Sequence, residues 1–259
     1  MAQDNGKFRI SLAMAEYLKL SPLPAPAKKL LLALIYLQEI EEEAWPKVLL
    51  DETGKPDVFK GEQFDLHYIP VSHLHFLGFA PRSKSSRFLT KPIADLQKLS
   101  GFFDDLSLKP GKNGRLSWKF GIFPAALMTD MDTYGLMESE DIAHCSGDFD
   151  VALLTQITLR HKMRFPISYF FTIDPKAGDL IEAVDFPVLD RRPFVAKLRR
   201  ALQKWATLKT CRLVAELRQN GSVPGITSVT IRISHSDTKW TEQQLSKYHP
   251  RSIVIDVSP

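Results

Sequence analysis

Cysteine is nearly absent from this chain of 259 residues, which contains only Cys145 and Cys211. Two thiols cannot form the network of disulfides that stabilises small secreted domains, and they suit a reducing compartment. The first ten residues, MAQDNGKFRI, lack the apolar core of a signal peptide. The longest apolar run, LLLALIYL at residues 30–37, is too short to span a bilayer. We therefore expect a soluble, cytoplasmic protein with no membrane partner.

Sequence motifs for nucleotide, metal and covalent chemistry are also missing. The chain contains neither G-x-x-x-x-G-K-[ST] nor G-x-G-x-x-G, the glycine-rich loops that hold phosphates. His73 and His75 lie in a segment predicted to be helical, where side chains two residues apart point in different directions. His144 and Cys145 are neighbours, but adjacency alone does not place a base against a nucleophile. We expect a protein that is not an enzyme and that has no cofactor and no bound metal.

Acidic and basic residues are distributed unevenly, although the net charge of the chain is only +4. Residues 1–80 carry a net charge of −3, and residues 81–123 carry +6. Residues 124–190 carry −8, and residues 191–259 carry +9. The alternation of acidic and basic segments occurs twice, which suggests that a structural unit also occurs twice.

The first half is predicted to contain, in order, a helix, a short strand, a short helix, a basic helical segment and a β-hairpin. These elements are expected at residues 24–43, 64–69, 71–79, 82–101 and 103–122. Pro92 suits the first turn of a helix better than its interior, so the basic segment is either one helix from about Pro92 or two pieces. The turn KPGKNG at residues 109–114 separates the two strands of the hairpin.

The second half repeats this order. It is predicted to contain a helix, a short apolar segment, a second short helix, a basic helix and a hairpin, at residues 148–165, 167–173, 177–186, 191–209 and 211–234. The apolar segment ISYFFTI is compatible with either a helix or a strand. Helix, short helix, basic helix and hairpin is the order of a winged helix.

The predicted fold class is therefore α+β, with two tandem winged-helix domains. Each domain is expected to have three or more helices and a β-hairpin wing. The first domain is assigned to residues 1–128 and the second to residues 148–259. The polar, acidic residues 129–147 are interpreted as a linker between them.

The basic helix in the second half has two different faces. An apolar stripe is predicted from six residues at helical spacing: Phe194, Leu198, Ala201, Leu202, Trp205 and Leu208. The other face is predicted to bind DNA through Lys197, Arg199, Arg200, Gln203, Lys204 and Thr207. Arg can bond bidentately to guanine and Gln to adenine, whereas Lys and Thr more often hold phosphates.

Two other interpretations of this helix remain: a solvated surface face, or a helix that lies on a membrane. A solvated face usually mixes charges, because Glu and Lys four residues apart stabilise a helix. Residues 191–211 contain seven Lys or Arg and no Asp or Glu. A polyanionic partner relieves such repulsion with release of counterions, so we favour DNA.

The first half has a smaller set of candidates. Its basic segment and its hairpin tip are predicted to contact DNA through Arg82, Lys84, Ser85, Arg87, Lys112 and Arg115. The alternative for the basic segment is a solvated loop, and the alternative for the tip is ordinary turn chemistry.

The order of elements resembles that of the iteron-binding plasmid replication initiators. The resemblance covers about residues 25–235 and rests on pattern, without an invariant signature. It includes YIPVSHLHFLGFAPRSKSSRFLTKPIADLQKL with the hairpin GFFDDLSLKPGKNGRLSWKF, and DVALLTQITLRHKMRFPISYFF with RRPFVAKLRRALQKWATLK. The chain departs from the family at Pro166, which falls where the family often continues a helix with Tyr and Leu.

The resemblance implies that both domains bind repeated sequences of double-stranded DNA at a replication origin. It implies that Arg199, Arg200, Gln203 and Lys204 make the main base contacts, and that the first domain contacts the backbone and mediates homodimerisation. Host replication proteins would be further partners. Three alternatives remain: a winged-helix transcription regulator, a protein-interaction module, and a Mg²⁺-dependent DNA-processing enzyme that uses acidic residues near Asp104 or Asp141.

Overall fold

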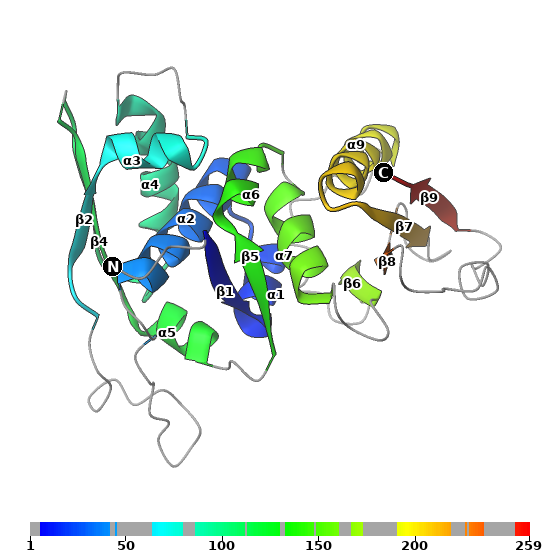
Figure 1. Cartoon of the computed structure of the whole chain (residues 1–259), viewed down its shortest axis with the longest axis horizontal. Helices are drawn as coiled ribbons and strands as arrows, with labels where there is room; N and C mark the ends of the chain where they lie inside the picture. The colour runs from blue at the N-terminus through cyan, green and yellow to red at the C-terminus, as the bar shows by residue number, and fades with distance from the viewer. Residues whose placement is uncertain are drawn as a thin grey trace, which may run out of the picture. The chain divides into compact units, whose positions relative to one another are not determined.

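The structure is a computed structural model, and it confirms the predicted α+β class: helices alternate with small antiparallel sheets (Figure 1). The chain divides into two compact units, the first formed by residues 1–18 and 23–151 and the second by residues 19–22 and 152–259. The structure describes residues 6–41, 45, 64–79, 86–111, 113–129, 133–147, 149–160, 167–172, 191–218, 226, 228–235 and 252–259.

The elements of the first unit follow one another from β1 to α6. They are β1 (Lys7–Ser11), α1 (Leu12–Leu20), α2 (Ala25–Glu41), β2 (His67–Pro70), α3 (Val71–Phe76), the 3₁₀-helix η1 (Ser86–Leu89), α4 (Thr90–Leu96), β3 (Phe103–Lys109), β4 (Arg115–Phe120), α5 (Ile122–Thr129), β5 (Tyr134–Glu138) and α6 (Ser139–His144). The basic segment is thus two helical pieces, η1 and α4. Pro92 lies buried in the first turn of α4, where its missing N–H has no cost.

A three-stranded sheet in the first unit has the order β2-β4-β3, with both pairs antiparallel. The predicted hairpin of β3 and β4 is therefore confirmed. Side chains alternate between the two faces of the strands, so one face of the sheet is buried. Leu106, Leu116 and Trp118 lie on that face and are shielded from solvent. The indole of Trp118 donates a hydrogen bond to Oε1 of the buried Gln38 on α2 at 3.1 Å. This bond satisfies the polar atom of the largest side chain in the sheet.

Helix α2 is buried on almost all sides, and even Lys29 within it is only 8% exposed. The ammonium of Lys29 donates to the carbonyls of Gly78 at 3.0 Å and Ala143 at 3.3 Å, and it lies 4.9 Å from the ring centroid of Phe79. Gly78 has a φ of 73°, and a Cβ there would lie 2.6 Å from the Cα of Ala143. Glycine is therefore required where the chain after α3 meets α6.

The interpretation of residues 129–147 as a linker differs from the structure. Strand β5 pairs antiparallel with β1, and helix α6 follows it directly, so both elements belong to the first unit. Met137 and Ile142 are fully buried there, and the acidic Asp141 is only 6% exposed. The partner of β5 is at the other end of the unit in sequence, so local composition did not reveal the pairing.

The second unit consists largely of one helix on one sheet. Its elements are α7 (Asp150–Arg160), which straddles the division between the units, β6 (Ile167–Thr172), α9 (Arg191–Leu208), β7 (Cys211–Arg218), β8 (Ser228–His235) and β9 (Ile253–Val257). The predicted basic helix and the hairpin of β7 and β8 are confirmed, and the described part of the apolar segment, Ile167–Thr172, is a strand. The predicted short helix at residues 177–186 and Pro166 lie outside the described residues.

The sheet of the second unit has the order β6-β8-β7-β9, and α9 packs against β7 and β9. Its first three strands repeat the arrangement of the first unit, because the third strand in sequence lies between the first and the second in both sheets. Strand β9 is an addition that pairs with the free edge of β7. The two units thus share a strand order as well as an order of elements.

Candidate nucleic-acid interface

One face of α9 is fixed by burial against the sheet. Leu198, Leu202, Trp205 and Ala206 are completely buried, and Phe194 is nearly so. These positions are three or four residues apart, so they form one stripe along the helix. The predicted stripe is confirmed except at Ala201, which is half-buried, and at Leu208, which is 40% exposed. The stripe orients α9 and leaves its other face to solvent.

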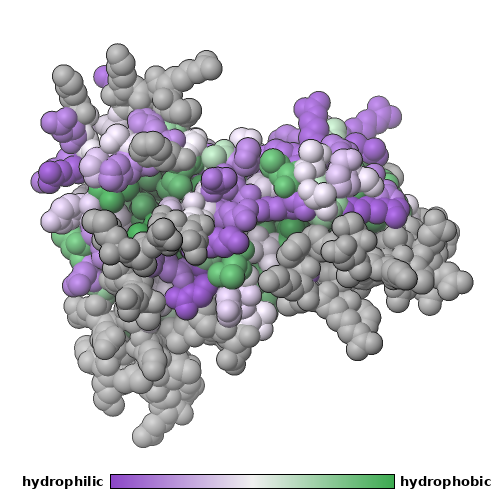
Figure 2. Space-filling view, in the orientation of Figure 1, coloured by the Kyte–Doolittle hydropathy of each residue, from purple (hydrophilic) through white to green (hydrophobic). Residues whose placement is uncertain are grey.

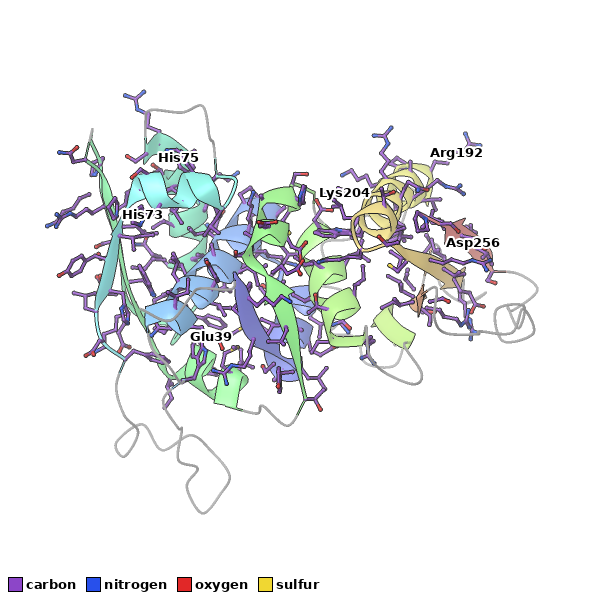
Figure 3. The ribbon with its side chains drawn as sticks, viewed as in Figure 1. Glu39, His73, His75, Arg192, Lys204 and Asp256 are labelled. Carbon is purple, nitrogen blue, oxygen red and sulfur yellow. The ribbon has the colours of Figure 1, made fainter. Side chains whose placement is uncertain are left out.

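The outward face of α9 is polar and carries no negative charge. Its exposed positions include Arg192, Lys197, Arg199, Arg200, Gln203 and Thr207. No Asp or Glu occurs between residues 191 and 208. Figure 2 shows hydrophilic side chains over this helix, and Figure 3 marks Arg192 and Lys204 on it. The charged side chains that α9 itself places on this face are therefore all cationic.

The described acidic residues of the second unit neutralise arginines on the strands rather than those on α9. Asp256 on β9 accepts a hydrogen bond from Nε of Arg212 at 2.9 Å. The fully buried Glu216 accepts from Nε of Arg218 at 3.1 Å and from Nη2 of Arg232 at 3.2 Å. These are the two carboxylates that the structure describes in residues 152–259. Both are therefore committed within the sheet.

Arg199 and Arg200 are both exposed, and within the described part of the chain neither forms a hydrogen bond or an ion pair. A guanidinium offers five N–H donors in a fixed planar fork, which suits phosphates and the major-groove edge of guanine. These two side chains are therefore the most available anion-binding groups on α9.

The other predicted residues of α9 are partly engaged by the protein itself. Nε2 of Gln203 donates to the carbonyl of Ser258 at 2.8 Å, and Oγ1 of Thr207 donates to the carbonyl of Gln203 at 3.1 Å. Lys204 is half-buried, with Nζ 5.5 Å from the ring centroid of Trp205. The structure thus brings the six predicted residues of α9 onto one helix, and it gives Gln203 and Thr207 hydrogen-bond partners within the protein.

The predicted residues of the first unit are described only in part. Arg87 is exposed on η1, and Arg115 is exposed at the start of β4, where its guanidinium carbon lies 6.0 Å from the ring centroid of Tyr68. Four others, Arg82, Lys84, Ser85 and Lys112, lie outside the described residues.

Three exposed cations on the same elements lie outside the predicted set of DNA contacts. Arg192 precedes the predicted set on α9, Lys91 lies on α4, and Lys109 pairs across the hairpin with Arg115. Sequence features could have identified these positions. Helical spacing places Arg192 and Lys91 on the outward side of their helices, and the alternation of β3 does the same for Lys109. Each position falls on the outward side of its element.

Side chains with other chemistry are not gathered into a site. Asp104 lies 3.8 Å from Nζ of Lys119, and Asp105 accepts from Oγ of Ser117 at 3.3 Å, so both acids are used within the hairpin. In the described part of the chain, no three His, Cys, Asp or Glu side chains come close enough to hold a metal. Within the same residues, no helix has the length and apolarity needed to cross a bilayer.

Cys145 and Cys211 are both buried and reduced. Burial raises the pKa of the Cys211 thiol to about 11, although the nearby charge of Lys209 acts in the opposite direction. A thiol with such a pKa is protonated at neutral pH and is a poor nucleophile. Cys211 therefore serves as a packed apolar group behind α9.

No model of a known protein family matches the chain, and no curated protein matches its sequence.

Proposed function

We propose that this protein binds double-stranded DNA sequence-specifically through two winged-helix units. The order of elements in each unit supports the proposal: a helix, a strand, a further helix and a hairpin, with the third strand between the first two in the sheet. The helix before the hairpin is basic in the second unit, whereas α4 in the first unit carries one Lys and one Asp. In a winged helix, the helix before the hairpin enters the major groove and the hairpin contacts the phosphate backbone. Helices α4 and α9 occupy that position here.

The observation that carries the proposal is the outward face of α9. Its exposed cations have no carboxylate among them, and Arg199 and Arg200 have no described partner. Like charges on one face of a helix repel one another, so this face costs stability in the free protein. A duplex offers closely spaced phosphates, and their binding releases counterions, which makes binding favourable at moderate salt.

The biological role that we propose is initiation of plasmid replication by binding repeated sequences at an origin. It rests on the resemblance in element order to the iteron-binding initiators, with host replication proteins and a second copy of the chain as further partners. A transcription regulator would use the same surface. Selected sites that recur in tandem within an origin favour initiation, whereas sites confined to a promoter favour regulation.

Binding of random and selected duplexes across a range of salt concentrations tests the proposal. We compare the wild type with R199A/R200A and with the control K7A/K98A, which removes the same charge from two lysines that are paired with Glu138 and Asp95. R199A/R200A should bind more weakly. The magnitude of its slope of log K against log salt should decrease by up to about 1.8, since each phosphate contact contributes about 0.9. The control should retain the slope of the wild type.

Two results would remove the proposal. If the wild type binds no duplex with salt-dependent affinity, the protein is not a DNA-binding protein of this kind. If R199A/R200A retains the affinity and salt slope of the wild type, α9 is not the interface.

A further inference from the structure

The exposed face of α9 contains a central ridge and two flanks. Ala196, Arg200, Gln203 and Thr207 are spaced four, three and four residues apart, so at about 100° per residue they form one ridge opposite the buried stripe. All four positions are exposed, whereas the half-buried Val195, Ala201 and Lys204 mark the borders of the face. A helix that enters a major groove points such a ridge at the bases and its flanks at the two phosphate backbones.

Gln203 is held in place by the chain after β9. Its Nε2 donates to the carbonyl of Ser258 at 2.8 Å, and its own backbone carbonyl accepts from Thr207. Bidentate recognition of adenine requires both ends of a Gln side chain, with Nε2 and Oε1 aligned on one base edge. The bond to Ser258 uses one of the two N–H donors of Nε2 and fixes the direction of the amide, so Gln203 could recognise adenine only in that direction, with its second N–H and Oε1.

Arg200 has the freedom that Gln203 lacks. No described residue forms a hydrogen bond or ion pair with it. A side chain on a helix extends over the turn that precedes it, which for Arg200 is the turn of Ala196. Because Ala196 is small and exposed, that turn can approach a base edge closely and leaves room for a guanidinium.

Arg199 differs from Arg200 in its place on the helix. One turn before it lies Val195, which is half-buried, so Arg199 belongs to the border of the exposed face. Lys197 lies at the opposite border, one turn before Ala201. Cations on both sides of a ridge fit the two phosphate backbones that line a major groove.

We infer that Arg200, supported by the small Ala196, selects a guanine in the target sequence, and that Gln203 is a positioning residue that ties α9 to the end of β9. The inference deepens the proposed function and rests on it. It names guanine as the base that the protein requires, and it assigns no recognition of adenine to Gln203.

The test is selection of sequences from a random duplex library, with the full chain as wild type and as R200A, R199A and Q203A. The wild type should enrich a guanine that R200A no longer requires. R199A and Q203A should weaken binding to all sequences alike and keep the same preferred site. R200K retains the charge but lacks the planar fork, so it should behave like R200A in its base preference.

Modified bases locate the contact in the groove. Replacing the selected guanine by 7-deazaguanine removes N7 from the major groove, whereas inosine removes only the minor-groove amino group. The first change should lower wild-type affinity about tenfold or more and leave R200A unaffected, and the second should have little effect on either. Circular dichroism of each variant verifies that α9 is still folded.

Three outcomes are informative. Loss of the guanine preference in R200A alone, with sensitivity to 7-deazaguanine, supports the inference. The inference is overturned if R200A still prefers the wild-type site, or if Q203A loses a preference for adenine. Because the wild type binds duplexes in both cases, the proposed function still stands. Absence of duplex binding by the wild type overturns both.

Discussion

Nη2 of Arg232 on β8 lies 3.2 Å from Oε2 of Glu216 on the neighbouring strand β7, and the carboxylate is completely buried. Arg218 binds the same carboxylate through Nε at 3.1 Å. Strands β7 and β8, which carry these side chains, belong to the sheet on which α9 lies. The strands beneath the proposed DNA-binding helix are thus joined by a buried ion pair as well as by their backbone hydrogen bonds.

We predict that E216Q strongly destabilises the protein. It removes the charge that compensates Arg232, whose side chain is only 12% exposed, and an uncompensated buried charge typically costs about 3 kcal/mol or more. D256N is the matched control, because Asp256 also faces an arginine on β7 but both side chains are exposed. An exposed pair contributes about 1 kcal/mol at most. Urea unfolding measures both, and equal losses would contradict the prediction.

The order of elements within each unit follows from local sequence, and this is why much of it was predictable. Strand β4 alternates cleanly, and a short turn joins it to its partner β3, so both strands can be identified from one short stretch of sequence. Helix α9 has an apolar stripe and a charged face, and the burial of Leu198 and Trp205 follows directly from that pattern.

Long-range pairing was not predictable in the same way. Strand β5 finds its partner in β1, and β9 finds its partner in β7 across residues 219–252. The bond between Gln203 and Ser258 depends on that second pairing, because β9 brings Ser258 to α9. A sequence pattern identifies Gln203 as polar and exposed, but it does not show that its side-chain amide donates a hydrogen bond to a carbonyl distant in sequence.

We predict that G78A destabilises the protein more than G6A. Both glycines have a positive φ, 73° at Gly78 and 65° at Gly6, so alanine costs about 1–2 kcal/mol of backbone strain at each. At Gly78 the new Cβ would also lie 2.6 Å from the Cα of Ala143, whereas at Gly6 the nearest atom is the hydroxyl of Ser139 at 3.3 Å. The steric contact should add roughly 1–3 kcal/mol. Thermal unfolding of the two variants measures the difference, and identical curves would show that α6 moves away without cost.

Cys211 should make the stability of the protein depend on pH in the alkaline range. The thiol has a pKa of about 11 in the folded protein, raised by burial, against 9.0 for an ordinary cysteine. Below pH 9 both states keep the proton, so the thiol has no effect on the pH dependence. Between pH 9 and 11 the unfolded state loses its proton first, and the free energy of unfolding falls as the pH rises.

C211A lacks this titration, so the free energy of unfolding of the wild type relative to C211A should decrease from pH 9 to pH 11. Urea unfolding at a series of pH values measures the difference. A difference that stays constant over this range would show that the thiol ionises as easily in the folded protein as in the unfolded one.

The first unit should contribute affinity without sequence preference. Its helix α4 exposes Lys91, but Lys98, two residues after the helix, is paired with Asp95 at 2.8 Å. The side chain of Gln97, just after α4, donates to the carbonyl of Leu106 at 2.7 Å and is thus engaged by β3. This surface therefore offers fewer groups for base recognition than α9 does.

We predict that R87A/K91A weakens binding of selected and random duplexes by the same factor. The slope of log K against log salt should fall by up to about 1.8, because only phosphate contacts are lost. R200A should instead weaken binding of the selected duplex more than that of random DNA, since a base contact distinguishes sequences and a phosphate contact does not. Titrations of both duplexes at two or more salt concentrations separate these effects. A change of preferred sequence in R87A/K91A would instead assign base recognition to the first unit.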